Sequence, residues 1–305
     1  MTYKERMEAY TKEAKRLSHE DNTEKLKEAV RLIMDSERLI IGGAAGLSAA
    51  GGMDFMSEKS LKKNFPALSD MGYKTLWQAL WDPNRSECQK WGMHAAEIIW
   101  ARFDYPVIKA YTDLLSIIEG KDYFVLTSNI DDQFYKAGFD PERVFAPQDS
   151  MAHFQCSVPC CDDIWYGEDI YRRIYENMDK KTFTCRPEDL PRCPHCGAPA
   201  INNVRDFKPF IPKMVMKNKE AFTRYFNEAA SHRTVFLELG VGFNSPGLIR
   251  HPFQRFTWLY PNAHLIRMNM EYPSVPDKIK DKSIEIGGDL GLALEKMAAV
   301  RNDMT

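Results

Sequence analysis

Short apolar runs recur along the chain, and each of them ends in small or amide-bearing residues. Continuous apolar runs of this length are typical of strands that are buried on both faces, as in a parallel sheet. Segments with a helical spacing of apolar residues separate the runs, which predicts an α/β fold around a parallel sheet. We expect ligand-binding groups at the edge where the carboxyl ends of such strands meet. The predicted strands cover residues 39–41, 123–127, 143–145, 234–239, 264–268 and 283–286.

The helical pattern occupies three parts of the chain. Residues 3–36 alternate charged and apolar positions at helical spacing, and residues 21–23 offer a cap for a second helix within this part. Residues 57–119 are predicted to be mainly helical and are rich in aromatic side chains. We assign most of these aromatics to packing, because helix-spaced aromatic residues usually belong to a core. A C-terminal helix is expected after residues 287–289.

Residues 39–55 run from the first predicted strand into glycines and other small residues. A buried strand that enters such a turn and a helix start lets backbone N–H groups approach a phosphate, because no larger side chain holds the ligand away. The other interpretation is a strand–turn–helix corner in which glycine only packs the helix against the sheet. The G-x-G-x-x-G spacing is absent, so the dehydrogenase fingerprint is not met.

The composition is that of an ordinary globular protein. Of the 305 residues, 44% are hydrophobic and 28% are charged, and the length allows two units, one inserted in the other. The formal net charge is −2 with no polybasic block, which argues against nucleic acid or an anionic membrane as the main partner. No apolar run approaches a membrane span and the N-terminus is charged rather than signal-like, so we expect a cytoplasmic, reducing location.

Six of the seven cysteines lie within one segment, which favours a metal site over disulfides in a reducing compartment. Two pairs, with C-x3-C and C-x2-C spacing, suit one tetrahedral Zn²⁺ ion. Four thiolates fill the coordination shell, so the predicted role is structural. Cys161 is an alternative to Cys160, Cys185 or His195 could compete, and buried thiols without a metal are the remaining interpretation. The predicted zinc ligands are Cys156, Cys160, Cys193 and Cys196.

The run Thr127-Ser128-Asn129-Ile130-Asp131 follows the second predicted strand. Amide and carboxylate groups at a strand end suit the recognition of ribose hydroxyls and a carboxamide, although a polar turn is the simpler alternative. Together with the small-residue segment and the four cysteines, this run resembles the sirtuin family. The corresponding family motifs are T-Q-N-I-D, G-A-G-x-S-x-x-S-G-x-P-D-F-R and a four-cysteine zinc site followed by glycine, here Gly197.

The resemblance implies NAD as the cofactor. It also implies that Asn129 contacts the nicotinamide ribose and that Asp131 helps to hold the nicotinamide amide. The match is partial, because Ala44 replaces a glycine, one residue is missing before Asp54, and Met56 stands where arginine is usual. The implied cofactor-binding residues are Ala45, Gly46, Ser48, Gly52, Asp54, Phe55, Ser128, Asn129, Asp131, Gln148, Gly240, Gly242, Asn269 and Asp289.

The resemblance covers about residues 25–295 and also implies a domain organisation. We expect a Rossmann-like parallel-sheet domain with an inserted, smaller zinc-binding module and a helical segment. The bounds that we assign are 1–56, 120–150 and 223–305 for the NAD-binding domain, 57–119 for the helical cofactor-loop segment and 151–222 for the zinc-binding module.

Gln148 is a departure from the family. Sirtuins carry a histidine in the motif E-L-H-G-S, where this chain has Ala146-Pro147-Gln148-Asp149-Ser150. That histidine is the general base in deacylation, and a carboxamide cannot accept and release protons near neutral pH. General-base help is worth roughly 10²–10⁴ in rate, so we expect deacylation to be largely lost. Attack of an acceptor on ribose C1′ needs less help from a base, so transfer to an acceptor can remain. The alternative is that Asp149 serves as a weak base in place of the missing histidine.

This combination is similar to the macrodomain-linked (class M) microbial sirtuins, which have glutamine at this position and act as protein ADP-ribosyltransferases. The resemblance implies a protein acceptor, a lipoyl-carrier protein of the glycine-cleavage H type, and a macrodomain hydrolase as functional partner that reverses the modification. We therefore expect NAD-dependent protein mono-ADP-ribosylation, with Asn129, Asp131 and Gln148 as the catalytic residues. A lysine deacylase and a non-catalytic NAD-binding scaffold are the alternatives.

Overall fold

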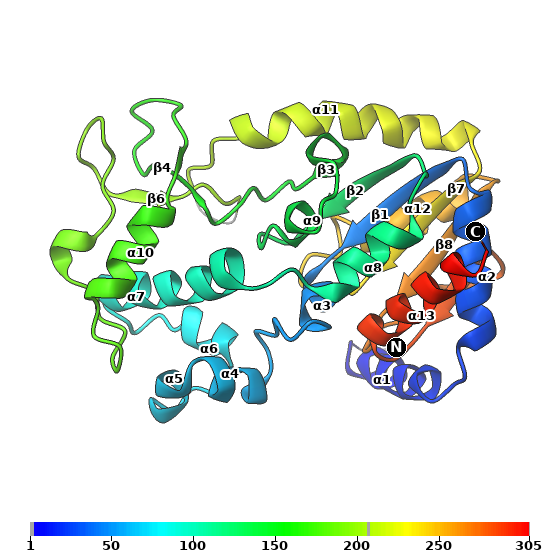
Figure 1. The fold of residues 1–305 in the computed structure, drawn as a ribbon, viewed down its shortest axis with the longest axis horizontal. Helices are drawn as coiled ribbons and strands as arrows, with labels where there is room; N and C mark the ends of the chain where they lie inside the picture. Colours follow the sequence, from blue (N-terminus) through cyan, green and yellow to red (C-terminus); the bar gives the residue numbers. More distant parts are fainter. Residues whose placement is uncertain (1–2, 206–207, 305) are drawn as a thin grey trace.

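The computed structural model describes residues 3–205 and 208–304, which form two lobes side by side (Figure 1). The larger lobe is built on a six-stranded parallel sheet with the strand order β3-β2-β1-β7-β8-β9. All six expected strands are present in it, which confirms the predicted α/β fold. The bounds are β1 Arg38–Gly43, β2 Tyr123–Thr127, β3 Val144–Phe145, β7 Thr234–Leu239, β8 Ala263–Met268 and β9 Ser283–Ile286.

Strand β1 lies in the middle of the sheet and continues through the two glycines that follow its apolar residues. A Cβ atom on Gly42 would lie 2.3 Å from Ile249 Cγ2, and one on Gly43 would lie 2.7 Å from Phe134 Cζ. Neither neighbouring side chain can move far in a packed core. Ile249 and Phe134 therefore leave space only for glycine at these two positions. Packing alone therefore accounts for these two glycines, whereas the later ones lie at the edge of the sheet.

Helices cover both faces of the sheet in the larger lobe (Figure 1). On one face α13 packs against α2 and α8 over a core that includes Ile41 and Leu237. On the other face α11 and α12 pack over Phe124 and Phe236. Burial on both sides explains why the strands are apolar throughout rather than alternating. The bounds are α2 Thr23–Asp35, α8 Lys109–Ile117, α11 Lys213–Glu228, α12 Arg250–Leu259 and α13 Leu290–Asn302.

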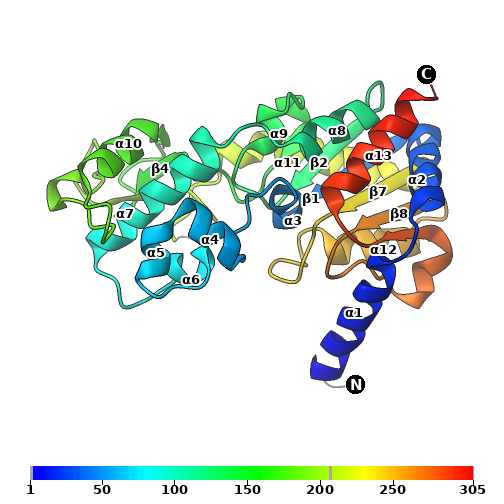
Figure 2. The ribbon, with the colours of Figure 1, turned by 60° about the horizontal axis from the view of Figure 1, so that its bottom comes forward.

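The N-terminal part forms two helices, as the periodicity predicts, and α1 (Tyr3–Ser18) extends away from the larger lobe (Figure 2). At the start of α2, the side chain of the N-cap residue Asn22 makes no capping hydrogen bond. Asp21 Oδ1 accepts from the backbone N of Thr23 at 3.0 Å, while the Asn22 side chain donates to the Gly287 carbonyl at 3.1 Å. Asn22 thus ties the turn between α1 and α2 to the end of β9. Within residues 3–205 and 208–304, no helix combines the length and apolar character needed to cross a membrane.

The smaller lobe combines two segments that are distant in sequence (Figure 2). The first contributes four helices and the π-helix η1, and the second contributes a three-stranded antiparallel sheet of order β5-β4-β6 and helix α10. Ile98 from the first segment lies in one hydrophobic cluster with Phe154 and Tyr171 from the second. The helical and the cysteine-bearing segments therefore share a core. The bounds are α4 Glu58–Asn64, α5 Pro66–Asp70, α6 Leu76–Leu80, α7 Glu87–Ile98, η1 Ile99–Asp104, β4 His153–Cys156, β5 Trp165–Tyr166, α10 Glu168–Asn177 and β6 Ala200–Asn202.

A buried cluster of charges holds the loops that follow β7 and β8. Glu238 accepts from Arg267 Nη2 at 2.8 Å and from Arg250 Nη1 at 3.1 Å, and all three side chains are at most 1% exposed. Arg250 also donates to the carbonyls of Val241 at 3.1 Å and Tyr272 at 3.0 Å. A buried charge is tolerated only when it is paired and hydrogen-bonded, so the carboxylate and the two loops depend on each other.

Replacing Glu238 by alanine tests this dependence. The substitution leaves two buried guanidinium groups without their carboxylate, and we expect it to lower the free energy of unfolding by about 3–5 kcal/mol. Equilibrium unfolding in urea measures the change. Lys62→Ala, which removes an exposed ion pair with Glu58, is the control and should cost less than about 1 kcal/mol. A Glu238→Ala variant as stable as that control would contradict the assignment.

Candidate active site

The turns that follow β1 and β7 contact each other at the carboxyl edge of the sheet. The strand order reverses between these two strands, which is the position where open α/β sheets bind ligands. The Gly46 N–H, in helix α3 (Ala45–Ala49), donates to the Gly240 carbonyl at 3.1 Å. A Cβ atom on Gly46 would lie 2.7 Å from Gly240 Cα, and Gly240 has a φ of +64°. Glycine is therefore required at both positions, and it lets the two turns close on each other.

Side chains from three elements meet at one hydroxyl group beside this contact. Ser48 Oγ on α3 donates to Asp131 Oδ2 at 2.6 Å and lies 2.7 Å from Tyr111 Oη. Asn129 Nδ2 donates to both Ser48 Oγ and Tyr111 Oη at 3.1 Å. Three of the predicted site residues thus belong to one hydrogen-bond network at the ends of β1 and β2.

Tyr111 is the member of this network that the sequence analysis missed. Its position on α8 predicts a core residue, and its ring is indeed fully buried, 4.8 Å from the ring of Phe134. Burial raises the pKa of Tyr111 well above its ordinary value, so the phenol keeps its proton and shares a hydrogen bond with the Ser48 hydroxyl. Helical spacing gives no signal that separates a packing tyrosine from one whose hydroxyl supports a site.

Two adjacent carboxyl groups lie in the turn before α9 (Gln133–Lys136). Burial raises the pKa of Asp131, and the hydrogen bond from Ser48 opposes that rise. Burial also raises the pKa of Asp132, against the positive charge of Arg102, which forms an ion pair with it. Arg102 belongs to η1, and such π-helical turns occur frequently at functional sites. The smaller lobe therefore contributes a charge to the turn that carries Asp131.

Gln148 lies in the loop after β3, next to the same turn. Its Nε2 donates to the backbone carbonyl of Ser128 at 2.6 Å, one residue before Asn129. Its own backbone carbonyl accepts from the N–H of Arg205 at 3.2 Å. The side chain is half-buried and presents a carboxamide, a group that neither gains nor loses a proton near neutral pH.

Asp149 braces the turn that carries Gln148. It is buried, with a φ of +63°, and its Oδ1 lies 2.8 Å from His153 Nδ1. Its Oδ2 accepts from Asn203 Nδ2 at 2.6 Å, and Asn203 Oδ1 accepts in turn from the N–H of Ile211 at 3.0 Å. Both carboxylate oxygens are thus engaged in holding neighbouring segments, which favours a positioning role over that of a weak base.

The predicted residues from the later strands line the same edge without joining the network. Asn269 Nδ2 donates to the Val241 carbonyl at 2.9 Å, which links the loops after β7 and β8. Asp289 is exposed and caps α13 by accepting from the N–H of Leu292 at 2.9 Å. Gly242 has no atom within 4 Å of the place where a Cβ would lie, so its backbone borders open space.

Of the remaining predicted residues, Ala45 begins α3, whereas Gly52, Asp54 and Phe55 lie in the loop between α3 and the smaller lobe. Gly52 has a φ of +91°, as a turn with a left-handed residue requires. Asp54 Oδ1 accepts from the N–H of Met56 at 2.8 Å, and the ring of Phe55 lies 5.7 Å from that of Trp100. The ring contact with Trp100 attaches the loop to the smaller lobe, whereas the contact of Asp54 is local to the loop.

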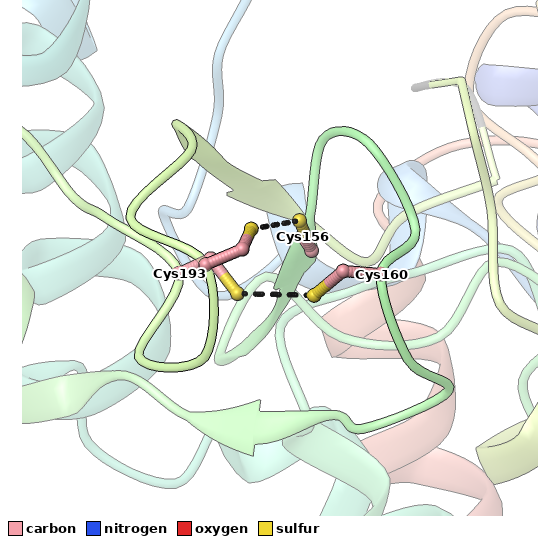
Figure 3. A group of neighbouring side chains, drawn as sticks. Cys156, Cys160 and Cys193 are labelled. Carbon is pink, nitrogen blue, oxygen red and sulfur yellow. Dashed lines mark hydrogen bonds between the residues drawn. The ribbon is translucent and has the colours of Figure 1, made fainter.

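The four predicted zinc ligands come together at the ends of two loops, and Figure 3 shows the sulfur atoms of Cys156, Cys160 and Cys193 directed toward one another. Cys156 Sγ lies 3.6 Å from Cys196 Sγ, and Cys160 Sγ lies 3.7 Å from Cys193 Sγ. A tetrahedral zinc ion with bonds of about 2.3 Å separates its sulfur ligands by about 3.8 Å. The cluster therefore fits zinc, as the cysteine spacing predicts.

The other candidate ligands lie outside the four-cysteine cluster. Cys161 is grouped with Asp163 and His195 on the neighbouring surface. Cys185 is buried in the core of the smaller lobe, and its N–H donates to the carbonyl of Cys88 at 3.1 Å. This placement favours Cys160 over Cys161 and Cys185 as a member of the four-cysteine cluster.

Comparison with known proteins gives two sequence relatives, and no protein-family model matches the chain. The chain is 28% identical over 289 residues to a Staphylococcus aureus protein named "Protein ADP-ribosyltransferase", covering 93% of this chain and 90% of that protein. It is 27% identical over 273 residues to a Fusarium oxysporum protein named "Probable bifunctional ADP-ribose hydrolase/ADP-ribosyltransferase", covering 86% of this chain and 46% of that protein.

Solved structures of Sir2 homologues match nearly the whole chain. The crystal structure of a Sir2 homologue in complex with NAD has a TM-score of 0.58 at 18% identity, covering 94% of this chain and 96% of that one. The chain therefore has the Sir2 fold. The motifs resemble those of the sirtuin family, and the sequence is similar to a protein ADP-ribosyltransferase, in agreement with this fold.

The burial of Asp131 leads to a prediction about pH. Because burial raises the pKa of Asp131 in the folded state, the native protein holds this proton to higher pH than the unfolded chain, and the contribution of Asp131 to stability falls as the pH rises. Asp131→Asn lacks this dependence. The free energy of unfolding of the variant minus that of the wild type should therefore become more positive from about pH 4 to about pH 7.

Urea unfolding at several pH values measures this difference. Asp70→Asn, at an exposed position, is the control for the loss of a carboxylate as such. If the difference in the free energy of unfolding between Asp131→Asn and the wild type stays constant, or becomes more negative with rising pH, burial is not the main influence on the pKa of Asp131.

The four-cysteine cluster leads to a prediction about folding. We expect Cys193→Ser to lose the zinc ion and the ordered smaller lobe, because structural zinc in small domains contributes roughly 10–16 kcal/mol of apparent binding energy to folding. Elemental analysis and near-UV circular dichroism of the tryptophan-rich smaller lobe measure the two losses. Cys88→Ser, which removes a thiol outside the cluster, should keep both the ion and the signal. Unchanged zinc content in Cys193→Ser would refute the assignment.

Proposed function

We propose that this protein is an NAD-dependent protein mono-ADP-ribosyltransferase of the sirtuin type. The observation that carries the proposal is the combination of the Ser48–Asn129–Asp131 network with a carboxamide at position 148. The network supports recognition of a ribose and a carboxamide, as hydroxyl, amide and carboxylate groups can pair with both. The carboxamide supports transfer to an acceptor over deacylation, because it cannot act as a general base.

The residues at the sheet edge fit NAD. The open space beside Gly242, next to the contact between Gly46 and Gly240, leaves room for a diphosphate near the backbone. We infer that these glycines accompany the diphosphate, and that Asn269 and Asp289 serve the adenosine end. NAD supplies the ADP-ribosyl group that is transferred. We infer that Gly52, Asp54 and Phe55 belong to the loop over the diphosphate, and that Ala45 lies beside it at the start of α3.

Each catalytic residue has a role that follows from its contacts. Asn129 donates its amide protons toward Ser48 and Tyr111, which fixes its carbonyl oxygen for a ribose hydroxyl. We infer that Asp131, held by the Ser48 hydroxyl, accepts from the nicotinamide amide. Gln148 is anchored to the Ser128 carbonyl and orients a hydroxyl or the acceptor without taking a proton. The brace formed by Asp149 keeps that carboxamide in place.

The acceptor that we propose is a lipoyl-carrier protein of the glycine-cleavage H type. Its support is the likeness of the motifs to the macrodomain-linked sirtuins, together with the S. aureus relative whose name is protein ADP-ribosyltransferase. The F. oxysporum relative has a name that joins ADP-ribose hydrolase and ADP-ribosyltransferase in one protein. This supports a macrodomain hydrolase as the partner that reverses the modification.

Intact-mass measurement of the carrier protein, with and without its lipoyl group, after incubation with NAD tests the proposal. We expect a gain of one ADP-ribosyl group, and transfer of radiolabel from adenylate-labelled NAD. Asn129→Ala should abolish the transfer, whereas Asn84→Ala, in an exposed turn, should leave it unchanged. Absence of labelling on the carrier and on every protein of a cell lysate would count against the proposed activity.

Gln148→His separates transfer from deacylation. An imidazole at this position restores a general base, which is worth roughly 10²–10⁴ in rate, so turnover of an acetyl or lipoyl peptide should rise from the background. The measurement is peptide turnover by the wild type and the variant in the same assay. Efficient deacylation by the wild type would instead favour a lysine deacylase, and NAD binding without nicotinamide release would favour a scaffold.

A further inference from the structure

A second group of metal-ligating side chains lies beside the four-cysteine cluster. Cys161, Asp163 and His195 each offer one donor atom, and these atoms all lie within 4.8 Å of one another. His195 Nε2 is 2.8 Å from Asp163 Oδ2, and Cys161 Sγ is 3.8 Å from Cys160 Sγ. The four-cysteine cluster already has a complete tetrahedral set of ligands, so these three donors are not needed there.

The loops that form the four-cysteine cluster also hold this second group in place. Cys160 and Cys161 are neighbours in the loop after β4, so a chain fixed at the first sulfur carries the second. His195 stands inside the tight turn between the last two cysteines of the cluster, a turn that ends at Gly197 with a φ of +73°. An ion bound by the four cysteines therefore orders both loops, which lowers the entropy cost of gathering the second set.

We propose that Cys161, Asp163 and His195 bind a second divalent transition-metal ion, for which zinc is the matching element. Thiolate, imidazole and carboxylate are the three ligand types that zinc accepts in proteins. Three protein ligands leave the fourth tetrahedral position to water.

The distances are compatible with this binding. A tetrahedral zinc ion holds donor atoms of these types about 3.3–3.8 Å apart. In the structure His195 Nε2 and Asp163 Oδ2 are 2.8 Å apart, and the distances from these atoms to Cys161 Sγ are at most 4.8 Å. His195 and Asp163 are 50% and 52% exposed, so their side chains can move by the roughly 1 Å that coordination requires.

Charge favours a second cation at this place. Four thiolates around one zinc ion keep a net charge of about −2, and an attraction of about 1 kcal/mol per pair of unit charges acts over 4 Å even in water. The competing explanation is an ordinary exposed ion pair between His195 and Asp163. Such a pair stabilises the fold by about 0–1 kcal/mol, and it does not explain why Cys161 lies beside it. Asp162, the next carboxylate, belongs elsewhere, because it pairs with Lys213 at 3.4 Å.

Metal counting on the full chain tests the proposal without reference to enzyme activity. The untagged protein is equilibrated with buffered zinc, and its metal content is measured by inductively coupled plasma mass spectrometry. We expect about two zinc ions per chain in the wild type and about one in the double variant Cys161→Ser/His195→Asn. Asp162→Asn, which removes the adjacent carboxylate, is the matched control and should keep both ions.

Cobalt provides a second readout, because its charge-transfer absorption reports bound thiolate. The wild type should show a second titration step that contains this absorption, and the double variant should lack that step. A single zinc ion in the saturated wild type, or a second ion retained by the double variant, overturns the proposal. If the double variant loses both ions, Asp163→Asn, which keeps every cysteine, decides the question by the same count.

Discussion

The contact between the backbones of Gly46 and Gly240 determines the arrangement of the sheet edge. Two turns from adjacent parallel strands can approach this closely only where neither carries a side chain. Their contact fixes the start of α3 and thereby the hydroxyl of Ser48. That hydroxyl forms hydrogen bonds with Asn129, Asp131 and Tyr111. The geometry of the polar network therefore depends on the packing of the two glycine backbones.

The electrostatic character of the site follows from burial. Asp131 is held in a place that disfavours its charge, and its hydrogen-bond partners are a serine hydroxyl and a backbone N–H, with a smaller stabilising contribution from the charge of Lys136. The cation Arg102 reaches only the next residue, Asp132. Such an environment lowers the stability of the folded protein, and it strengthens the interaction of the carboxylate with a polar ligand. Active sites commonly combine these two effects. The carboxamide of Gln148 adds no titrating group to this setting.

Those features that depend on local sequence were predictable. The strands could be found because burial on both faces makes every position apolar, and the zinc ligands because their spacing is local. The features that depend on long-range contacts were not. Tyr111 looks like any core aromatic until its hydroxyl meets Ser48, and Arg102 owes its reach to a π-helical turn that periodicity does not reveal. The shared core of residues 57–104 and 151–204 likewise has no signature in either segment.

That shared core bears on how the chain folds while it is being synthesised. The helical segment emerges from the ribosome with apolar residues such as Ile98 whose partners, among them Tyr171, follow roughly 70 residues later, a delay of about 3–15 s at ordinary translation rates. During this delay half of a hydrophobic core faces water. The nascent chain is therefore most vulnerable to aggregation, and most dependent on chaperones, before the cysteine-bearing strands have emerged.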